Sequence, residues 1–187
     1  MFTLSTKNQW LVSGILLLAI IVTRAHVTDH LLDASWAVFF LAGFYLRNAL
    51  TFGVFMATAV AIDYVAITKF GVSDFCVSQA YVALIPAYGA LFVAGRWFAG
   101  QYQGETLATL GKLMLAVVVG FAVAQLISSG SFYFFSGKFA EVSLVEFGNR
   151  LVKYSPNSLY TMSLYITVGA FVHVAVSMLN RQFVHSK

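Results

Sequence analysis

The sequence predicts an all-α integral membrane protein, a single domain over residues 1–187 with six transmembrane helices. Charged residues make up only 10% of the chain and hydrophobic residues 60%, whereas about a quarter of a soluble domain is charged. The apolar residues also gather in stretches that approach the roughly 20 residues needed to cross about 30 Å of hydrocarbon as a helix. A membrane barrel is excluded because no strands of about ten residues alternate between apolar and polar positions.

The first predicted helix follows Lys7, and no small-residue cleavage site comes after it, so we expect a retained helix and not a signal peptide. The first two helices are short and reach about 17 residues only if flanking polar side chains extend toward the interface. The later four are long enough by themselves. In chain order the six predicted helices are residues 10–23, 34–46, 49–68, 80–98, 107–127 and 159–179.

Six crossings place both termini on the same side of the membrane. That side carries six basic residues and the other side carries five, a small excess that favours cytoplasmic termini by the positive-inside rule. The six are Lys7, Arg47, Arg96, Lys112, Arg181 and Lys187; the five are Arg24, Lys69, Lys138, Arg150 and Lys153. In a membrane protein the distribution of basic residues over the loops matters more than the net charge of +4. That charge therefore does not indicate a nucleic-acid partner, and none is expected. A nucleotide hydrolase is excluded as well, because no glycine-rich phosphate-binding loop is present.

Asp63 is the first candidate for a functional residue. It lies about five residues from the outer end of the third predicted helix, where a bare carboxylate is costly. Two interpretations stay open: a functional acid, or an ion pair with Arg150 or Lys69 that fixes helix packing.

Cys76 is the only cysteine of the chain, so no disulfide can form within it. It lies in an outer loop between the third and fourth helices, together with Asp74 and Tyr81. The thiol is either a small buried side chain or, as a thiolate, a soft metal ligand or nucleophile.

The histidines give weaker signals. His26 and His30 are four residues apart in an outer loop, and a metal site there would need Asp29 and Asp33 as further ligands; the alternative is a solvated loop. His173 lies in the other half of the last helix, so it does not share a depth with His26 or His30, and a bis-histidine haem is not expected.

Residues 131–158 form the longest predicted outer connection, which opens with four consecutive aromatic residues. Its later part resembles a short interfacial helix. It is expected to act either as a surface anchor or as a lid over an outward-facing pocket for a large planar ligand.

Residues 41–97 resemble the BtuM-type cobalamin (vitamin B12) transporters, small proteins similar to the S-components of energy-coupling-factor transporters. The segments Pro86-Ala87-Tyr88-Gly89 and Gly95-Arg96-Trp97 carry the match, together with Arg47, Asp63, Cys76 and Tyr81. The resemblance is strong over about a third of the chain. It implies an S-component-like bundle in a bacterial cytoplasmic (inner) membrane.

The resemblance further implies an outward-facing corrinoid pocket in which Cys76 ligates cobalt in the base-off form. Asp63, Tyr81 and Arg150 would hydrogen-bond the propionamide side chains or hold the binding loops, and His30 is a further candidate contact. Electron donation from the thiolate would weaken the cyanide bond on the other face of cobalt. Loss of cyanide from cyanocobalamin is therefore expected, and whether it is catalytic stays open. No other cofactor is expected.

The first predicted helix lacks the Ala-x-x-x-Ala pair with which S-components contact the energy-coupling-factor module. Ala57 and Ala61 in the third helix form such a pair, which close helix packing also explains. The protein is thus expected to work alone by facilitated passage or to use a partner through other contacts. The alternative functions are transport of another vitamin and a non-transport role as a membrane assembly subunit, in which Cys76 would be dispensable.

Overall fold

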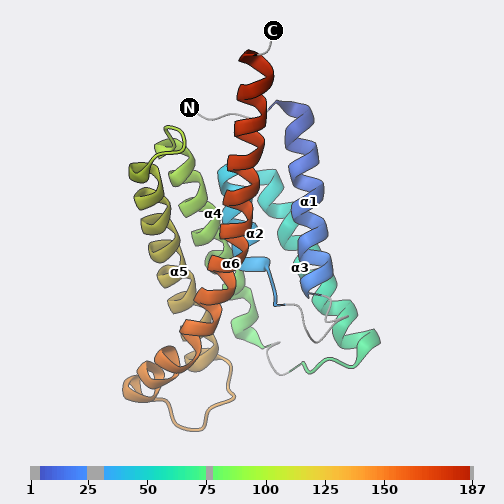
Figure 1. Cartoon of the computed structure of the whole chain (residues 1–187). Coiled ribbons are helices and arrows are strands. Elements are labelled where there is room, and N and C mark those ends of the chain that lie inside the picture. Colours follow the sequence, from blue (N-terminus) through green and yellow to red (C-terminus); the bar gives the residue numbers. More distant parts are fainter. Residues whose placement is uncertain (1–4, 25–31, 75–77, 186–187) are drawn as a thin grey trace.

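The computed structural model describes residues 5–24, 32–74 and 78–185, and over these ranges the chain is helical without any β-strand. The all-α prediction is confirmed for this part of the chain, and Figure 1 shows the helices as one bundle. They are α1 (Thr6–Arg24), α2 (Ser35–Tyr45), α3 (Ala49–Phe70), α4 (Leu84–Gln101), α5 (Leu107–Phe135) and α6 (Leu144–His185), with a short 3₁₀ helix η1 (Gln79–Ala83) before α4.

Five of these helices are long and apolar enough to cross a membrane: α1, α3, α4 together with η1, α5 and α6. By this measure the chain is a multi-pass membrane protein. The remaining predicted span, residues 34–46, corresponds to α2. At 11 residues, α2 extends about 16 Å, roughly half of the hydrocarbon core.

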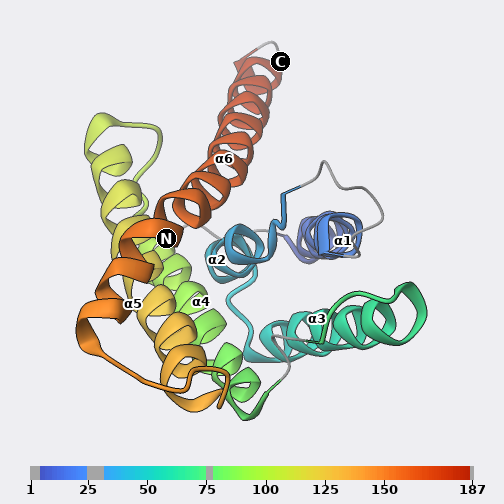
Figure 2. The same cartoon turned by 90° about the horizontal axis from the view of Figure 1, so that it is seen from below.

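Helix α2 is apolar because it is buried in protein. Viewed along the bundle in Figure 2, it lies between α1, α3, α4 and α6, and it contacts all four. Eight of its 11 residues are buried. Apolar side chains on every face are expected for a helix in the centre of a bundle.

The loop between α5 and α6 differs from the prediction. Helix α5 continues past residue 127 to Phe135, and α6 begins at Leu144, so the connection is residues 136–143. The serines do not end α5 because their side chains find partners within the helix: the Ser131 hydroxyl donates to the Ile127 carbonyl, and Gln125 donates to Ser129.

The predicted interfacial helix is the first part of α6. This part bends relative to the rest of α6 in Figure 1, and Pro156 lies inside the helix. Proline lacks the backbone N–H that would continue the helical hydrogen bonds, which accounts for a bend without an interruption.

The contact between α2 and α4 is closer than side chains would allow. A Cβ atom on Gly43 would lie 2.0 Å from the Phe92 carbonyl oxygen, and one on Gly95 would lie 1.9 Å from the Phe40 carbonyl oxygen. Only glycine fits at either position. The two helices therefore form the central pair of the bundle. Phe39 of α2 and Leu91 of α4 are fully buried.

Successive helices alternate in direction, as Figure 1 shows. The end of the bundle where α1 begins and α6 ends is called here the terminal end, and the end where α1, α3 and α5 stop is the distal end. Toward the terminal end α6 crosses α2, where the Leu41 side chain would approach a Cβ on Gly169 to 3.3 Å. Each end of α2 holds a cluster of polar side chains.

Candidate functional site

Arg24, the last residue of α1, is the centre of a polar cluster in the distal half of the bundle. It is only 8% exposed. Its Nε donates to Asp63 Oδ1 at 2.7 Å and its Nη2 donates to Asp63 Oδ2 at 2.8 Å. This is the two-point contact between guanidinium and carboxylate, which fixes orientation as well as distance.

The third guanidinium nitrogen of Arg24 faces α2 and α4. Nη1 lies 2.9 Å from the Tyr88 hydroxyl oxygen, 3.0 Å from the Ser35 hydroxyl oxygen and 3.0 Å from Asp33 Oδ2. The Arg24 side chain thus connects α1 with α3, with α4 and with the start of α2. We call Arg24, Asp33, Ser35, Asp63, Tyr81 and Tyr88 the Arg24 cluster.

Asp63 is largely engaged within the protein. Besides the two bonds from Arg24, its Oδ2 accepts a hydrogen bond of 2.6 Å from the Tyr81 hydroxyl. An ionised carboxylate has about four acceptor positions, so three are used. Tyr81 itself is placed by η1, whose first turn is capped by the Ser78 hydroxyl accepting from the Ala80 backbone N–H.

Asp33 and Tyr88 are also fixed by their surroundings. Asp33 Oδ1 accepts from the Ser35 backbone N–H at 2.9 Å and from the Ser35 hydroxyl at 2.5 Å. The buried Tyr88 ring stacks on Phe39 of α2 with 4.3 Å between ring centroids. The start of α2 and the first half of α4 thus hold their parts of the cluster in place.

Two carboxylates share one guanidinium in this cluster. The Arg24 side chain is 10% exposed, while those of Asp63 and Asp33 are 21% and 40% exposed. The positive charge is therefore inside and the surplus negative charge is toward the accessible side. Such an arrangement favours a ligand that presents hydrogen-bond donors, such as amide N–H groups, over an anion.

The predicted ion pair of Asp63 exists, but its predicted partner is wrong. Arg24 takes the position that the sequence interpretation gave to Arg150 or Lys69. Arg24, at the end of α1, lies at the same depth as Asp63 because α1 and α3 both run from the terminal end to the distal end. That common depth is the one signal in the sequence that points to Arg24.

Arg150 lies in a different cluster at the distal end. Its Nε donates to Glu146 at 2.9 Å, one helical turn away in α6. Its guanidinium lies 4.6 Å from the centroid of the Phe139 ring and 5.7 Å from that of Tyr133. The structure thus brings Asp63 and Tyr81 together, but among the described residues their contacts do not include Arg150.

Cys76, His26, His30 and Asp29 lie outside the described residues. Within the described part of the chain, no group of three or more His, Cys, Asp and Glu residues could hold a metal ion. Asp33, which was the fourth candidate ligand of a loop metal site, is bonded to Arg24 and Ser35.

A cavity of about 820 Å³ lies beside the Arg24 cluster, between α3 and the start of α4. Tyr81 lines it, so the residue that bonds Asp63 also faces this space. Ala57 and Ala61 line it as well and are exposed, so none of the described helices covers either of them. The other lining residues are Phe52, Gly53, Met56, Val60, Tyr64, Val82 and Ile85.

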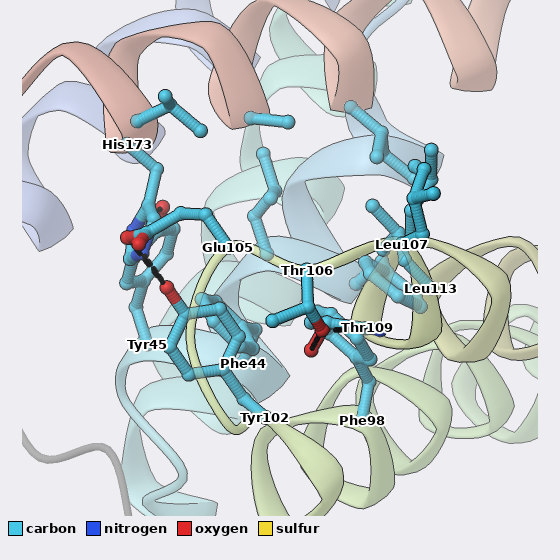
Figure 3. A pocket seen from close by; sticks show the side chains of 16 residues that line it. Phe44, Tyr45, Phe98, Tyr102, Glu105, Thr106, Leu107, Thr109, Leu113 and His173 are labelled. Carbon is cyan, nitrogen blue, oxygen red and sulfur yellow. Dashed lines mark hydrogen bonds between the residues drawn. The ribbon is translucent and has the colours of Figure 1, made fainter. Parts of the chain in front are cut away.

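A second cavity, of about 390 Å³, lies at the terminal end between α2, α4, α5 and α6. Figure 3 shows its aromatic lining and the polar side chains at its edge. His173 accepts or donates through both ring nitrogens, with Nδ1 at 3.1 Å from the Tyr45 hydroxyl and Nε2 at 2.9 Å from the Tyr102 hydroxyl. Tyr102 and Ser177 donate to Glu105 Oε1 at 3.0 and 2.7 Å.

Comparison of the sequence with models of known protein families gives no match, and comparison with curated proteins gives none either. The resemblance to cobalamin transporters therefore stays a prediction, and the functional argument depends on the residues themselves.

Proposed function

We propose that this protein binds cobalamin at its distal end and carries it across the inner membrane of a bacterium. The observation that supports the proposal best is the Arg24 cluster. Ionisable residues within membrane helices are rare and mark ligand pathways by default. Here two of them, Arg24 and Asp63, meet in one cluster with Asp33, which lies just before α2, and the two carboxylates, which are more exposed than the guanidinium, are hydrogen-bond acceptors.

The chemistry of this cluster suits a corrinoid. The rim of a corrin ring carries several amide side chains, each of which has two N–H donors. Asp33 and Asp63 keep acceptor positions that Arg24, Ser35 and Tyr81 do not use. An anionic vitamin would instead meet a surplus of negative charge.

The surroundings of the cluster suit a large ligand. The cavity beside Tyr81 is about 820 Å³, toward the upper end of the range for small-molecule sites. Aromatic rings gather at the same distal end around Tyr133, Phe139 and Phe147. Apolar and aromatic walls with a few fixed polar groups are typical of sites for small organic ligands.

Cys76 is the proposed cobalt ligand. Its thiolate would replace the dimethylbenzimidazole nitrogen on the lower face of the corrin ring. The cobalt–carbon bond on the upper face would then break with both electrons leaving on cyanide, which takes a proton from water, and the remaining hydroxide would take the vacated position on cobalt. This is a ligand exchange at constant cobalt oxidation state, so release of one cyanide per bound cobalamin needs no reductant.

The proposed orientation has both termini in the cytoplasm and the Arg24 cluster toward the outside. The basic residues of the sequence support it, since the terminal end holds the larger number of them. The protein then takes up its ligand from the outer face. Transport works either alone or with an energy-coupling-factor module, which would dock without an Ala-x-x-x-Ala pair on α1.

The visible absorption spectrum of the purified protein tests the proposal. Wild-type, Cys76→Ala and Cys76→Ser proteins are incubated with cyanocobalamin in detergent, and free ligand is removed by size-exclusion chromatography. We expect the wild type to retain a corrinoid with a spectrum different from that of free cyanocobalamin and to release cyanide. Cys76→Ser tests the sulfur at nearly constant size and should lose both the altered spectrum and the cyanide release.

Colourless wild-type protein would contradict the proposal and favour another vitamin or an assembly role. Retained corrinoid with the same spectrum in all three proteins would leave cobalamin binding but remove cobalt–thiolate ligation. Uptake of radiolabelled cobalamin by cells that lack other cobalamin transporters then separates transport from binding alone.

A further inference from the structure

We infer that Arg24 is the positioning residue of the corrinoid site, and that Asp63 acts mainly through Arg24 and Tyr81. This inference rests on the proposed function. Of the two roles that the resemblance implies for Asp63, bonding the ligand or holding the binding loops, it selects the second. It also assigns a role to Arg24, for which the sequence suggested none.

The geometry of Asp63 carries the first step. Both of its carboxylate oxygens are bonded to Arg24, at 2.7 and 2.8 Å, and Oδ2 also accepts from Tyr81 at 2.6 Å. Its side chain is half as exposed as that of Asp33. A carboxylate with three internal bonds is a fixed support, and its main effect on a ligand is through the groups it holds.

The position of Arg24 carries the second step. Through Asp63 it fixes Tyr81, which lines the large cavity beside α3. Through Nη1 it fixes Asp33, the most exposed carboxylate of the cluster. Two ligand-facing groups on separate segments of the chain, one before α2 and one in η1, are thus oriented by a single buried cation.

Arginine suits this task better than lysine. Its planar guanidinium holds five N–H donors in a fixed arrangement, so the directions from Nε, Nη1 and Nη2 set the angle between the two carboxylates. A lysine ammonium at the same place would supply the charge without this geometry. Arg24→Lys therefore separates charge from positioning.

The experiment compares Arg24→Gln, Arg24→Lys, Asp63→Asn and Tyr81→Phe with a matched control, Lys69→Gln. Lys69 is an exposed cation near the end of the same helix as Asp63, and it takes no part in the Arg24 cluster. For each protein, thermal stability without ligand, the dissociation constant for cyanocobalamin and the spectrum of the bound corrinoid are measured. Tyr81→Phe removes one hydroxyl group and preserves the ring, so it provides a folded variant if Arg24→Gln does not fold.

We expect Arg24→Gln and Asp63→Asn each to weaken cyanocobalamin binding by about tenfold or more, the factor that one charge-assisted hydrogen bond supplies. Tyr81→Phe and Arg24→Lys should weaken it less, and Lys69→Gln should match the wild type. The double variant Arg24→Gln/Asp63→Asn should bind cyanocobalamin as tightly as whichever single variant binds it more weakly. The effects of two substitutions are not additive when the two residues act as a unit.

A structural role alone gives a different result. Arg24→Gln would then lower the thermal stability, while the folded fraction would bind cyanocobalamin with the wild-type constant and spectrum. That outcome would overturn the inference, as would equal losses in Arg24→Gln and Lys69→Gln.

A measurement without corrinoid keeps the inference independent of the proposed function. Cys76 is the only thiol of the chain, so its rate of reaction with a maleimide is read without background. Arg24→Gln and Tyr81→Phe should raise this rate by about threefold or more if the Asp63–Tyr81 bond holds the start of η1, a local opening of less than 1 kcal/mol. If the wild type binds no cobalamin, the proposed function fails but this rate still tests the positioning; unchanged rates would overturn it.

Discussion

The two ends of α2 hold polar clusters of opposite character. At the distal end, the Arg24 cluster contains a buried guanidinium and two carboxylates. At the terminal end, Tyr45, Tyr102, Glu105, His173 and Ser177 form what we call the His173 cluster, in which an imidazole ring joins two hydroxyl groups. The first cluster is ionic, and the second is built around groups that can exchange donor and acceptor roles.

This difference decides how each cluster responds to change. The donors of Arg24 cannot be reversed, so the Arg24 cluster has one arrangement. In the His173 cluster, Tyr102 donates to Glu105 and can accept from His173 Nε2, which leaves Tyr45 to donate to Nδ1. In the other tautomer Tyr102 would donate to Nε2 and give up its bond to Glu105, which would still accept from Ser177. The distal end is thus a rigid site, while the terminal end can rearrange.

The largest effect is expected from breaking the helix contact that supports both clusters. Gly43→Val and Gly95→Val place side chains where the neighbouring backbone oxygens are 2.0 and 1.9 Å away. We expect each to cost about 3 kcal/mol or more, because α2 and α4 must separate. The yield of monodisperse protein in detergent and its thermal unfolding measure this.

Gly14→Val is the matched control for this prediction, since nothing lies within 4 Å of a Cβ at Gly14. Equal stability of Gly95→Val and Gly14→Val would show that α2 and α4 are not in close contact in the membrane.

The next effect is the loss of the buried cation. Arg24→Leu leaves Asp33 and Asp63 close together without a counter-charge, and removing one partner of a buried ion pair costs about 3 kcal/mol or more. Unfolding by sodium dodecyl sulfate in mixed micelles should show this loss. The double variant Arg24→Leu/Asp63→Leu should regain part of the stability, because it removes one of the two unpaired charges. A loss below about 1 kcal/mol, typical of surface pairs, would contradict the rigid description of the distal end.

The sequence predicted much of this fold because apolar length is a direct signal in a membrane protein. The third helix was placed at residues 49–68 and is Ala49–Phe70, and all six predicted segments are helical. The prediction that residues 34–46 cross the membrane overestimated the length of α2, because an apolar stretch has the same composition whether lipid or protein covers it. It ended α5 too early, because the hydroxyl groups of Ser129 and Ser131 are bonded inside the helix.

The candidate site was predicted only in part. Asp63 was found because a carboxylate in a membrane helix is unusual by itself, and Tyr81 because it lies close to Cys76 and belongs to the family resemblance. The two side chains are bonded to each other. Arg24, Ser35 and Tyr88 were missed because each is ordinary in its own segment. Their importance comes from four helices meeting at one depth, which spacing along the chain does not reveal.

A smaller effect is expected at the terminal end. His173→Phe removes two hydrogen bonds but preserves a ring against Phe44, whose centroid lies 5.9 Å from that of His173. Because Tyr45 and Tyr102 can turn to other partners, we expect a loss of about 1 kcal/mol in unfolding free energy and unchanged corrinoid binding. The contrast with Arg24→Leu is the test: a loss of similar size in both variants would remove the distinction between a rigid and an adaptable end.

The smallest effect on stability is expected from Arg150→Gln. Its ion pair with Glu146 joins residues one helical turn apart with side chains 38% and 49% exposed, and such pairs contribute about 0.3–0.5 kcal/mol. Contact with the Phe139 and Tyr133 rings adds about 0.5 kcal/mol, the low end of the range for an exposed site. Stability should therefore fall by about 1 kcal/mol at most, so the corrinoid dissociation constant can be compared directly. Weaker binding in this folded variant would place Arg150 at the ligand, as the family resemblance implies, while unchanged binding would restrict its role to bracing the aromatic residues at the start of α6.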